Sequence, residues 1–145
     1  MTTPNGPAGR SGPRRYPPAM KLLLIAAGGA LGTIARHVLD GWIQRCVPGS
    51  SFPLGILAVN ALGSFGIGAA MACLSARGAL DSTLRVVLTA GVLGGFTTYS
   101  SFNYQALELL RARDWPTGGL YVACTLGGCL LAGALGLAAG RWLAG

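Results

Sequence analysis

Long apolar stretches without charged residues dominate the chain. Three of them run from Leu54 to Leu74, from Val86 to Leu107 and from Gly118 to Gly140. Each exceeds the ~18 apolar residues that make a segment a candidate membrane span, since a bilayer core of ~30 Å needs about 20 residues of helix. A fourth stretch, from Leu22 to about Trp42, is uncharged until Arg36 near its far end. The pattern predicts an all-α membrane protein with four transmembrane helices.

The amino-acid composition also indicates a membrane protein rather than a water-soluble one. Of its 145 residues, 52% are hydrophobic and only 10% are charged, against roughly 25% charged in soluble domains. Residues 1–18, rich in Pro, Gly and Arg, show no periodicity, and we expect them to form a disordered basic tail before a transmembrane domain at 19–145. The first apolar run continues to Ala35, beyond the ~7–15 residues of a signal peptide's apolar region. A cleaved signal is therefore not expected.

The net charge of +7 does not predict nucleic-acid binding, because the basic residues are scattered at the ends of the spans. Lys and Arg in short loops set the orientation of a membrane protein. Outside the tail, one side of a four-span arrangement holds Lys21, Arg77, Arg85 and Arg141, and the other side holds Arg36, Arg45, Arg111 and Arg113. The tie leaves two interpretations open. Either the basic tail decides a single orientation, or the chain inserts both ways and pairs with an inverted copy of itself.

Small residues recur at the i, i+4 spacing that places them on one helix face. Rows of this kind are Gly28–Gly32–Arg36–Asp40, Asn60–Ser64–Gly68, Tyr121–Thr125–Cys129–Gly133 and Ala132–Gly136–Gly140. In lipid, small residues let helix backbones approach closely, so these rows predict tight packing and oligomerisation. The four cysteines include no CxxC pair and are expected to pack as small apolar groups.

The stretch GGFTTYSSF, from Gly94 to Phe102, interrupts the third apolar run with a glycine pair and five successive hydroxyl side chains. Glycine costs helix stability, and Thr and Ser compete for backbone hydrogen bonds. We therefore predict that the helix breaks in this stretch, after Leu93. About ten helical residues precede the pair and reach only halfway across a bilayer, so the break is expected near the midplane. Irregular backbone at that depth must be buried in protein or line an aqueous cavity, which predicts an ion site.

The polar groups expected at that depth are hydrogen-bond donors. The acids Asp40, Asp81, Glu108 and Asp114 are placed at span ends by the pattern, and this leaves hydroxyls, the Asn60 amide and the electropositive ring edges of aromatic residues. Arg36 can attract anions at a vestibule, unless it pairs with Asp40 four residues on. The residues alone predict a narrow, dehydrating path for a small anion.

Three motifs resemble those of one known family. GGFTTYSSF resembles the signature of the CrcB/Fluc fluoride channels, GILAVNALGSFGIG resembles that family's second-helix pattern around an Asn, and GGALGTIARHVL resembles its first-helix glycine motif ending in Arg. The likeness covers about Lys21 to Arg141. It implies an antiparallel, dual-topology homodimer in the bacterial inner membrane. The dimer would conduct fluoride passively out of the cell through two pores and hold a structural sodium ion at its centre.

The resemblance also implies roles for individual residues. The backbone carbonyls of Gly94 and Thr97 would bind sodium, Asn60 would donate to fluoride, and Tyr99 and Phe102 would present ring edges to it. Ser100, Ser101, Tyr121 and Thr125 would line the pore and Arg36 the vestibule. Tyr99 departs from the family's usual Phe, which leaves the effect of its hydroxyl open.

Three other functions fit the sequence less well. A small multidrug-type exporter is also a dual-topology four-span dimer, but it needs an acid within the membrane. A non-conducting membrane assembly subunit would leave the hydroxyl run unexplained. An enzyme is not expected, because His37 is the only histidine and no nucleophile–base pair is evident.

Overall fold

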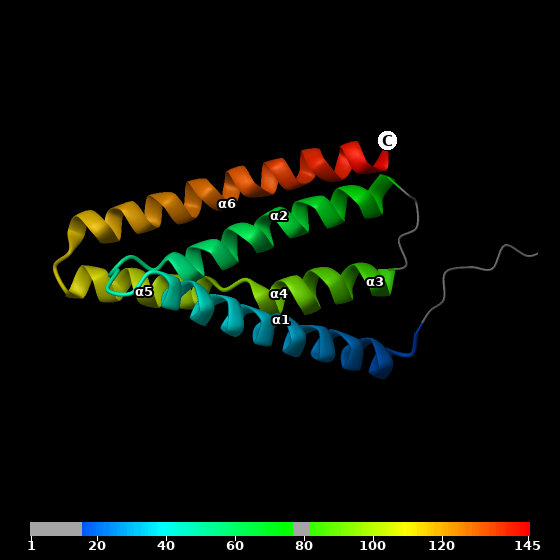
Figure 1. Cartoon of the computed structure of the whole chain (residues 1–145). Coiled ribbons are helices and arrows are strands. Elements are labelled where there is room, and N and C mark those ends of the chain that lie inside the picture. The colour runs from blue at the N-terminus through cyan, green and yellow to red at the C-terminus, as the bar shows by residue number, and fades with distance from the viewer. Residues whose placement is uncertain (1–15, 77–81) are drawn as a thin grey trace, which may run out of the picture.

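A computed structural model describes residues 16–76 and 82–145, and their regular structure is helical. Three long helices, α1 (Pro18–Cys46), α2 (Leu54–Ala76) and α6 (Trp115–Ala144), lie alongside a row of shorter ones, as Figure 1 shows. That row consists of α3 (Ser82–Val86), the π-helix η1 (Val87–Leu93), α4 (Gly94–Phe96) and α5 (Tyr99–Arg111). Residues 1–15 of the predicted tail lie outside the described residues.

Three of the four predicted spans are single helices long and apolar enough to cross a membrane. They contain 29, 23 and 30 residues, so that at 1.5 Å per residue even the shortest reaches about 34 Å. The remaining predicted span, Val86–Leu107, is not one regular helix. It is divided among η1, α4 and α5, with the first residue in α3. Four helical rods therefore fit the fold, but only three of them are regular throughout. We call the fourth, from Ser82 to Arg111, the interrupted rod.

Glycine rows make the closest helix contacts. α2 packs most extensively against α6, where a Cβ on Gly136 would run into the backbone of Phe65, 2.8 Å from its carbonyl carbon. α1 packs in the same way against the interrupted rod, because a Cβ on Gly95 would lie 2.9 Å from the Cα of Gly29. These contacts are shorter than any side chain allows. The prediction that small-residue rows mediate tight packing is confirmed.

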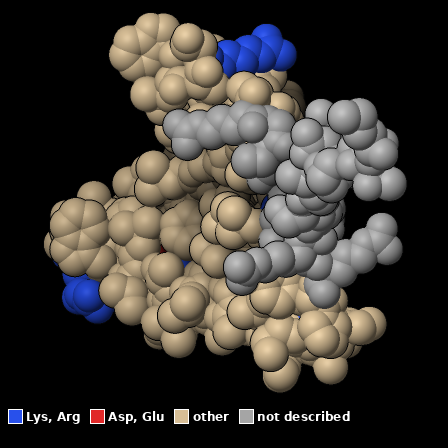
Figure 2. Space-filling view, turned by 90° about the vertical axis from the view of Figure 1, so that its right-hand side faces the viewer, with Lys and Arg blue, Asp and Glu red and all other residues tan. Residues whose placement is uncertain are grey.

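The outside of the bundle is mostly apolar. Large hydrophobic side chains such as Leu22, Leu130 and Trp142 expose 67%, 77% and 82% of their surface, which is the opposite of a solvated surface. Figure 2 looks onto the end of the bundle that carries the C-terminus, and basic side chains lie at its rim while most of the visible described surface is uncharged. Such an exterior suits a hydrocarbon surrounding.

Candidate ion-binding groove

The interrupted rod loses its helical conformation at two residues. Thr97 is extended, with φ −78° and ψ 152°, and Thr98 is extended as well, with φ −148° and ψ 113°. Gly94 has helical dihedrals (φ −65°, ψ −37°) and begins α4. The irregular residues thus lie inside the predicted stretch but begin three residues later than expected, because α4 continues the helix from Gly94 to Phe96. Gly95 allows α1 to approach, and the threonines leave the helix.

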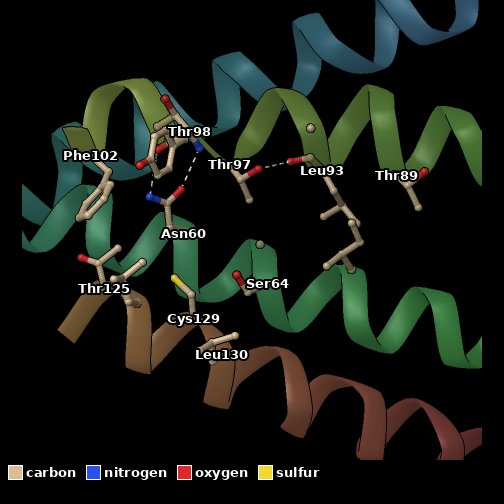
Figure 3. Close-up of a pocket in the computed structure, with 15 residues that line it drawn as sticks. Asn60, Ser64, Thr89, Leu93, Thr97, Thr98, Phe102, Thr125, Cys129 and Leu130 are labelled. Atoms are coloured by element: carbon tan, nitrogen blue, oxygen red, sulfur yellow. Dashed lines mark hydrogen bonds between the residues drawn. The ribbon is translucent and has the colours of Figure 1, made fainter. Parts of the chain in front are cut away.

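The Asn60 side chain pairs with the backbone of Thr98. Its Nδ2 donates to the Thr98 carbonyl oxygen at 3.1 Å, and the Thr98 amide donates to its Oδ1 at 2.8 Å. Figure 3 shows this pair at the gap between α4 and α5. Both residues are buried, so the two backbone groups would otherwise lack partners in a dry interior. One Asn60 amide hydrogen remains for another acceptor.

Local hydrogen bonds hold the two helix ends on either side of the gap. The Thr97 amide donates to the Leu93 carbonyl at 2.9 Å, and the Thr97 hydroxyl donates to the same oxygen at 3.1 Å. Thr98 is the N-cap of α5, since its Oγ1 accepts from the Ser101 amide at 3.2 Å. An N-cap threonine is a standard way to satisfy a free amide at a helix start.

Two backbone amides near the gap do not bond to the carbonyls that they would meet in a continuous helix. In a continuous α-helix the Thr98 amide would bond to the Gly94 carbonyl and the Ser101 amide to the Thr97 carbonyl, four residues back. Here the Thr98 amide goes to Asn60 and the Ser101 amide to the Thr98 hydroxyl. The carbonyls of Gly94 and Thr97 are therefore released from these helical bonds. They belong to the two residues for which the sequence predicted cation-binding carbonyls.

A groove of about 410 Å³ runs along the interrupted rod between α2 and α6. We call it the groove throughout. Six of the predicted site residues line it, namely Asn60, Gly94, Thr97, Tyr99, Phe102 and Thr125. Figure 3 shows Phe102 and Thr125 on one side of the Asn60–Thr98 pair and Leu93 and Thr89 on the other. The fold thus gathers, from three separate rods, groups that are distant in the chain.

Aromatic rings form one end of the groove. The Tyr99 and Phe102 rings lie 5.6 Å apart, and Phe102 lies 5.4 Å from the Tyr121 ring. Phe102 and Tyr121 are buried, whereas Tyr99 exposes 75% of its surface. Tyr99 and Phe102 fall three residues apart on one face of α5, which explains why both reach the groove. Ring edges carry the positive part of the aromatic quadrupole and can face an anion.

A second cavity, of about 530 Å³, lies between α1 and α5 and is more polar. Arg36, Ser100 and Ser101 line it, and the Arg36 guanidinium reaches the Ser101 hydroxyl at 3.5 Å. We call it the polar cavity. The hydroxyl run is therefore divided by the geometry of α5. Tyr99 faces the groove, while the two serines face the polar cavity with Arg36.

The polar cavity also contains an acid. Asp40, six residues before the end of α1, lines it. Of the two roles left open for Arg36, the pair with Asp40 is not formed. Within residues 16–76 and 82–145 the one salt bridge found joins Arg111 to Glu108 at 3.4 Å. Arg36 Nε and Asp40 Oδ1 are both buried without a hydrogen-bond partner.

Sequence reasoning did not single out three residues that the geometry brings into the site. Thr98 carries the backbone that Asn60 holds, and Gln105 accepts from the Tyr121 hydroxyl at 2.9 Å while lining the polar cavity. The Thr33 hydroxyl donates to the Gly95 carbonyl at 3.3 Å. The Thr98 cap has a sequence signal, a threonine just before a helical segment, whereas Gln105 stands out only as an amide in an uncharged stretch. Thr33 gives no such signal.

Residues 23–137 match the sequence model of the family described as "CrcB-like protein, Camphor Resistance (CrcB)". The chain belongs to the CrcB family. The resemblance inferred from the three motifs is thereby confirmed. With three helices able to cross a membrane, this CrcB chain is a multi-pass membrane protein.

Relatives of this CrcB chain share most of its length. It is 47% identical over 119 residues to the "Fluoride-specific ion channel FluC" of Sorangium cellulosum (strain So ce56), covering 82% of this chain and 93% of that protein. Proteins of the same name from Anaeromyxobacter sp. (strain K) and Thermus thermophilus are 43% and 45% identical over 125 residues. Those alignments cover 86% of this chain and 98% and 97% of the two relatives.

Proposed function

We propose that this protein is a fluoride-selective channel that lets cytoplasmic fluoride leave the cell down its electrochemical gradient. The observation that carries the proposal is the Asn60–Thr98 pair, which holds an extended backbone segment open beside a groove lined by hydrogen-bond donors and aromatic rings. The names of the relatives support the choice of fluoride. They do not favour a multidrug-type exporter or a non-conducting assembly subunit.

The interruption at Thr97–Thr98 falls near the bilayer midplane in this proposal. Exposed aromatic side chains, which favour membrane interfaces, stand at both ends of α1 and α6. The separations from Tyr16 to Trp42 and from Trp115 to Trp142 are each about 40 Å at 1.5 Å per residue, matching a bilayer with its headgroups.

Residues halfway along these two helices adjoin the interruption. Gly29, near the middle of α1, touches Gly95. Cys129, near the middle of α6, lines the groove together with Thr97. Both contacts support a position of the extended segment at about half depth. Irregular backbone is tolerated there because protein surrounds it.

Selective passage of fluoride requires that the protein replace its hydration shell. The free Asn60 amide hydrogen, the Thr125 hydroxyl and the ring edges of Phe102 and Tyr99 can do so along the groove. Thr125 Oγ1 is buried without a hydrogen-bond partner, so its hydroxyl is available to an ion. In this proposal the complete path is narrow and rejects larger halides by size. Ser100, Ser101 and Arg36 would continue the path through the polar cavity. Tyr121 lines neither cavity and adjoins the path through its hydrogen bond to Gln105.

A sodium ion fits the released carbonyls. Carbonyls freed at an interrupted helix are typical sodium ligands, and those of Gly94 and Thr97 have lost their helical donors. Gly94 is exposed at the protein surface, so two carbonyls from this chain would be completed by two from a second copy. Sodium would then hold together backbone groups that repel each other as dipoles.

The second copy is an inverted one in this proposal. The groove is open along the protein surface, and Gly94 and Tyr99 on its edge are exposed. The equal numbers of basic residues on the two sides of the spans allow either orientation in the membrane. Two antiparallel copies would close two grooves at once. We place this dimer in the inner membrane of a bacterium.

Fluoride efflux from liposomes tests the proposed function. Vesicles containing the protein and loaded with potassium fluoride are expected to release fluoride on addition of valinomycin, while vesicles loaded with potassium chloride retain it. Phe102→Leu keeps an apolar side chain but removes the ring edge, and should slow release at least tenfold. Leu131→Ala, on the exposed face of α6, is the matched control and should release fluoride normally. Equal release of chloride and fluoride would refute selectivity.

A further inference from the structure

The polar cavity holds charges of both signs. Arg36, His37 and Asp40 come from consecutive turns of α1 and line one wall, while Ser101 and Tyr104 line the opposite wall on α5. Arg36 and Asp40 are four residues apart, a spacing that places their side chains on one face at about 6 Å between Cβ atoms. An anion entering beside Arg36 would therefore also meet the Asp40 carboxylate.

The two charges do not neutralise each other by direct contact. They form no salt bridge within 4.0 Å, although the described residues include such a pair elsewhere. Arg36 extends instead toward α5, where its Nη1 reaches the Ser101 hydroxyl. Its Nε and the Oδ1 of Asp40 each remain buried without a hydrogen-bond partner. The guanidinium thus keeps donor capacity for an anion, and Asp40 lines the same cavity without a salt-bridge partner among the described residues.

Packing fixes the carboxylate in place. Asp40 lies against Gly55, in the first turn of α2, so closely that a Cβ on Gly55 would collide with the Asp40 carboxylate oxygen and lie 2.9 Å from its backbone oxygen. Glycine at this position leaves room for the acid. The start of a helix also carries partial positive charge, which favours an ionised carboxylate next to it. Asp40 is therefore held as a fixed group rather than a mobile surface acid.

We propose that Asp40 sets the fluoride affinity of the polar cavity, acting as a fixed negative charge that weakens anion binding at Arg36 and speeds release into the aqueous phase. The proposal rests on the proposed channel function. A cationic site with donors on two sides would hold fluoride long enough to slow conduction, because throughput requires binding that is weak enough to leave. A carboxylate one turn away opposes that binding without blocking the cavity.

Single-channel recording of the full-length protein in planar bilayers tests this role. The unitary fluoride current is measured against fluoride concentration in wild type and in Asp40→Asn, which keeps the side-chain shape and removes the charge. We expect the half-saturating fluoride concentration to fall about tenfold, equivalent to ~1.4 kcal/mol, and the saturating current to fall as well. The difference should shrink when an impermeant salt raises the ionic strength to about 1 M, where the Debye length is ~3 Å.

Matched variants separate charge from packing. Asp40→Glu should retain the weaker fluoride binding, and Glu108→Gln removes the same charge from an exposed site in the last turn of α5, so it should leave the half-saturating concentration unchanged. If Asp40→Asn fails to assemble, Asp40→Ser supplies a smaller neutral side chain. Failure of both to assemble, or a half-saturating concentration that stays constant or rises, would overturn the proposal. A wild-type protein without fluoride current would instead refute the channel function itself.

Discussion

Replacing Asn60 tests what keeps the interrupted rod open. Asn60→Ala would leave the Thr98 amide and carbonyl without the bonds of 2.8 and 3.1 Å that they now make. An unsatisfied buried polar group costs about 1–3 kcal/mol, which gives about 2–6 kcal/mol for two. Interhelical hydrogen bonds measured in membranes average ~0.6 kcal/mol, so two would give only about 1.2 kcal/mol. Because Thr98 is buried, we expect a loss of about 2–4 kcal/mol.

The assay is unfolding of the purified protein in detergent, followed by the fluorescence of its three tryptophans. Ser64→Ala, one turn further along the same face of α2, is the matched control and should change stability by less than about 0.5 kcal/mol. Hydrogen exchange at Thr98 adds a second readout, since its amide should lose protection in Asn60→Ala. A stability loss below about 1 kcal/mol with continued protection would mean that the Thr98 amide returns to the Gly94 carbonyl in a regular helix. The idea that Asn60 holds the interruption open would then be wrong.

Three further predictions concern packing, the aromatic end of the groove and the cation. Gly136→Ala should destabilise the protein by about 2 kcal/mol or more, because its methyl group would meet the backbone of Phe65, whereas Gly127→Ala, with nothing within 4 Å, should be neutral in the same unfolding assay. Tyr99→Phe should change fluoride efflux by less than about twofold, because the exposed hydroxyl makes no hydrogen bond among the described residues; a large loss would assign the phenol a direct role. Replacing sodium with N-methyl-D-glucamine on both sides of the membrane should reduce fluoride current severalfold, and an undiminished current in sodium-free solution would contradict the cation site.

The linear pattern of residues was sufficient for the architecture and for the kind of site. Four apolar stretches predicted four rods, and i, i+4 rows of glycine predicted which faces pack closely. The hydroxyl run after Gly94–Gly95 located the irregular segment to within a few residues. These features can be predicted from sequence because helix length, side-chain periodicity and the competition of Ser and Thr side chains for backbone hydrogen bonds are all local properties.

Partners across the fold could not be read in this way. The sequence marked Asn60 only as a hydrogen-bond donor at membrane depth, and only the packing of α2 against the interrupted rod assigned two of its hydrogen bonds to Thr98. In the structure the interruption lies at Thr97 and Thr98 rather than at the glycine pair. Likewise, the i, i+4 spacing of Arg36 and Asp40 allowed a salt bridge, yet Arg36 reaches Ser101 on α5 instead.

The insertion of a segment into the membrane depends on its own residues, whereas the pairing of polar groups depends on the packed fold. Which segments enter the membrane as helices depends on the transfer of each segment from water, and each segment carries that information in its own composition. Which polar group satisfies which other group depends on distances between rods that are far apart in the chain, and these distances are set by glycine contacts such as Gly95 on Gly29. The sequence by itself therefore determined the four helical rods and the stretch in which one of them is interrupted. Only the tertiary structure decided where the polar groups meet.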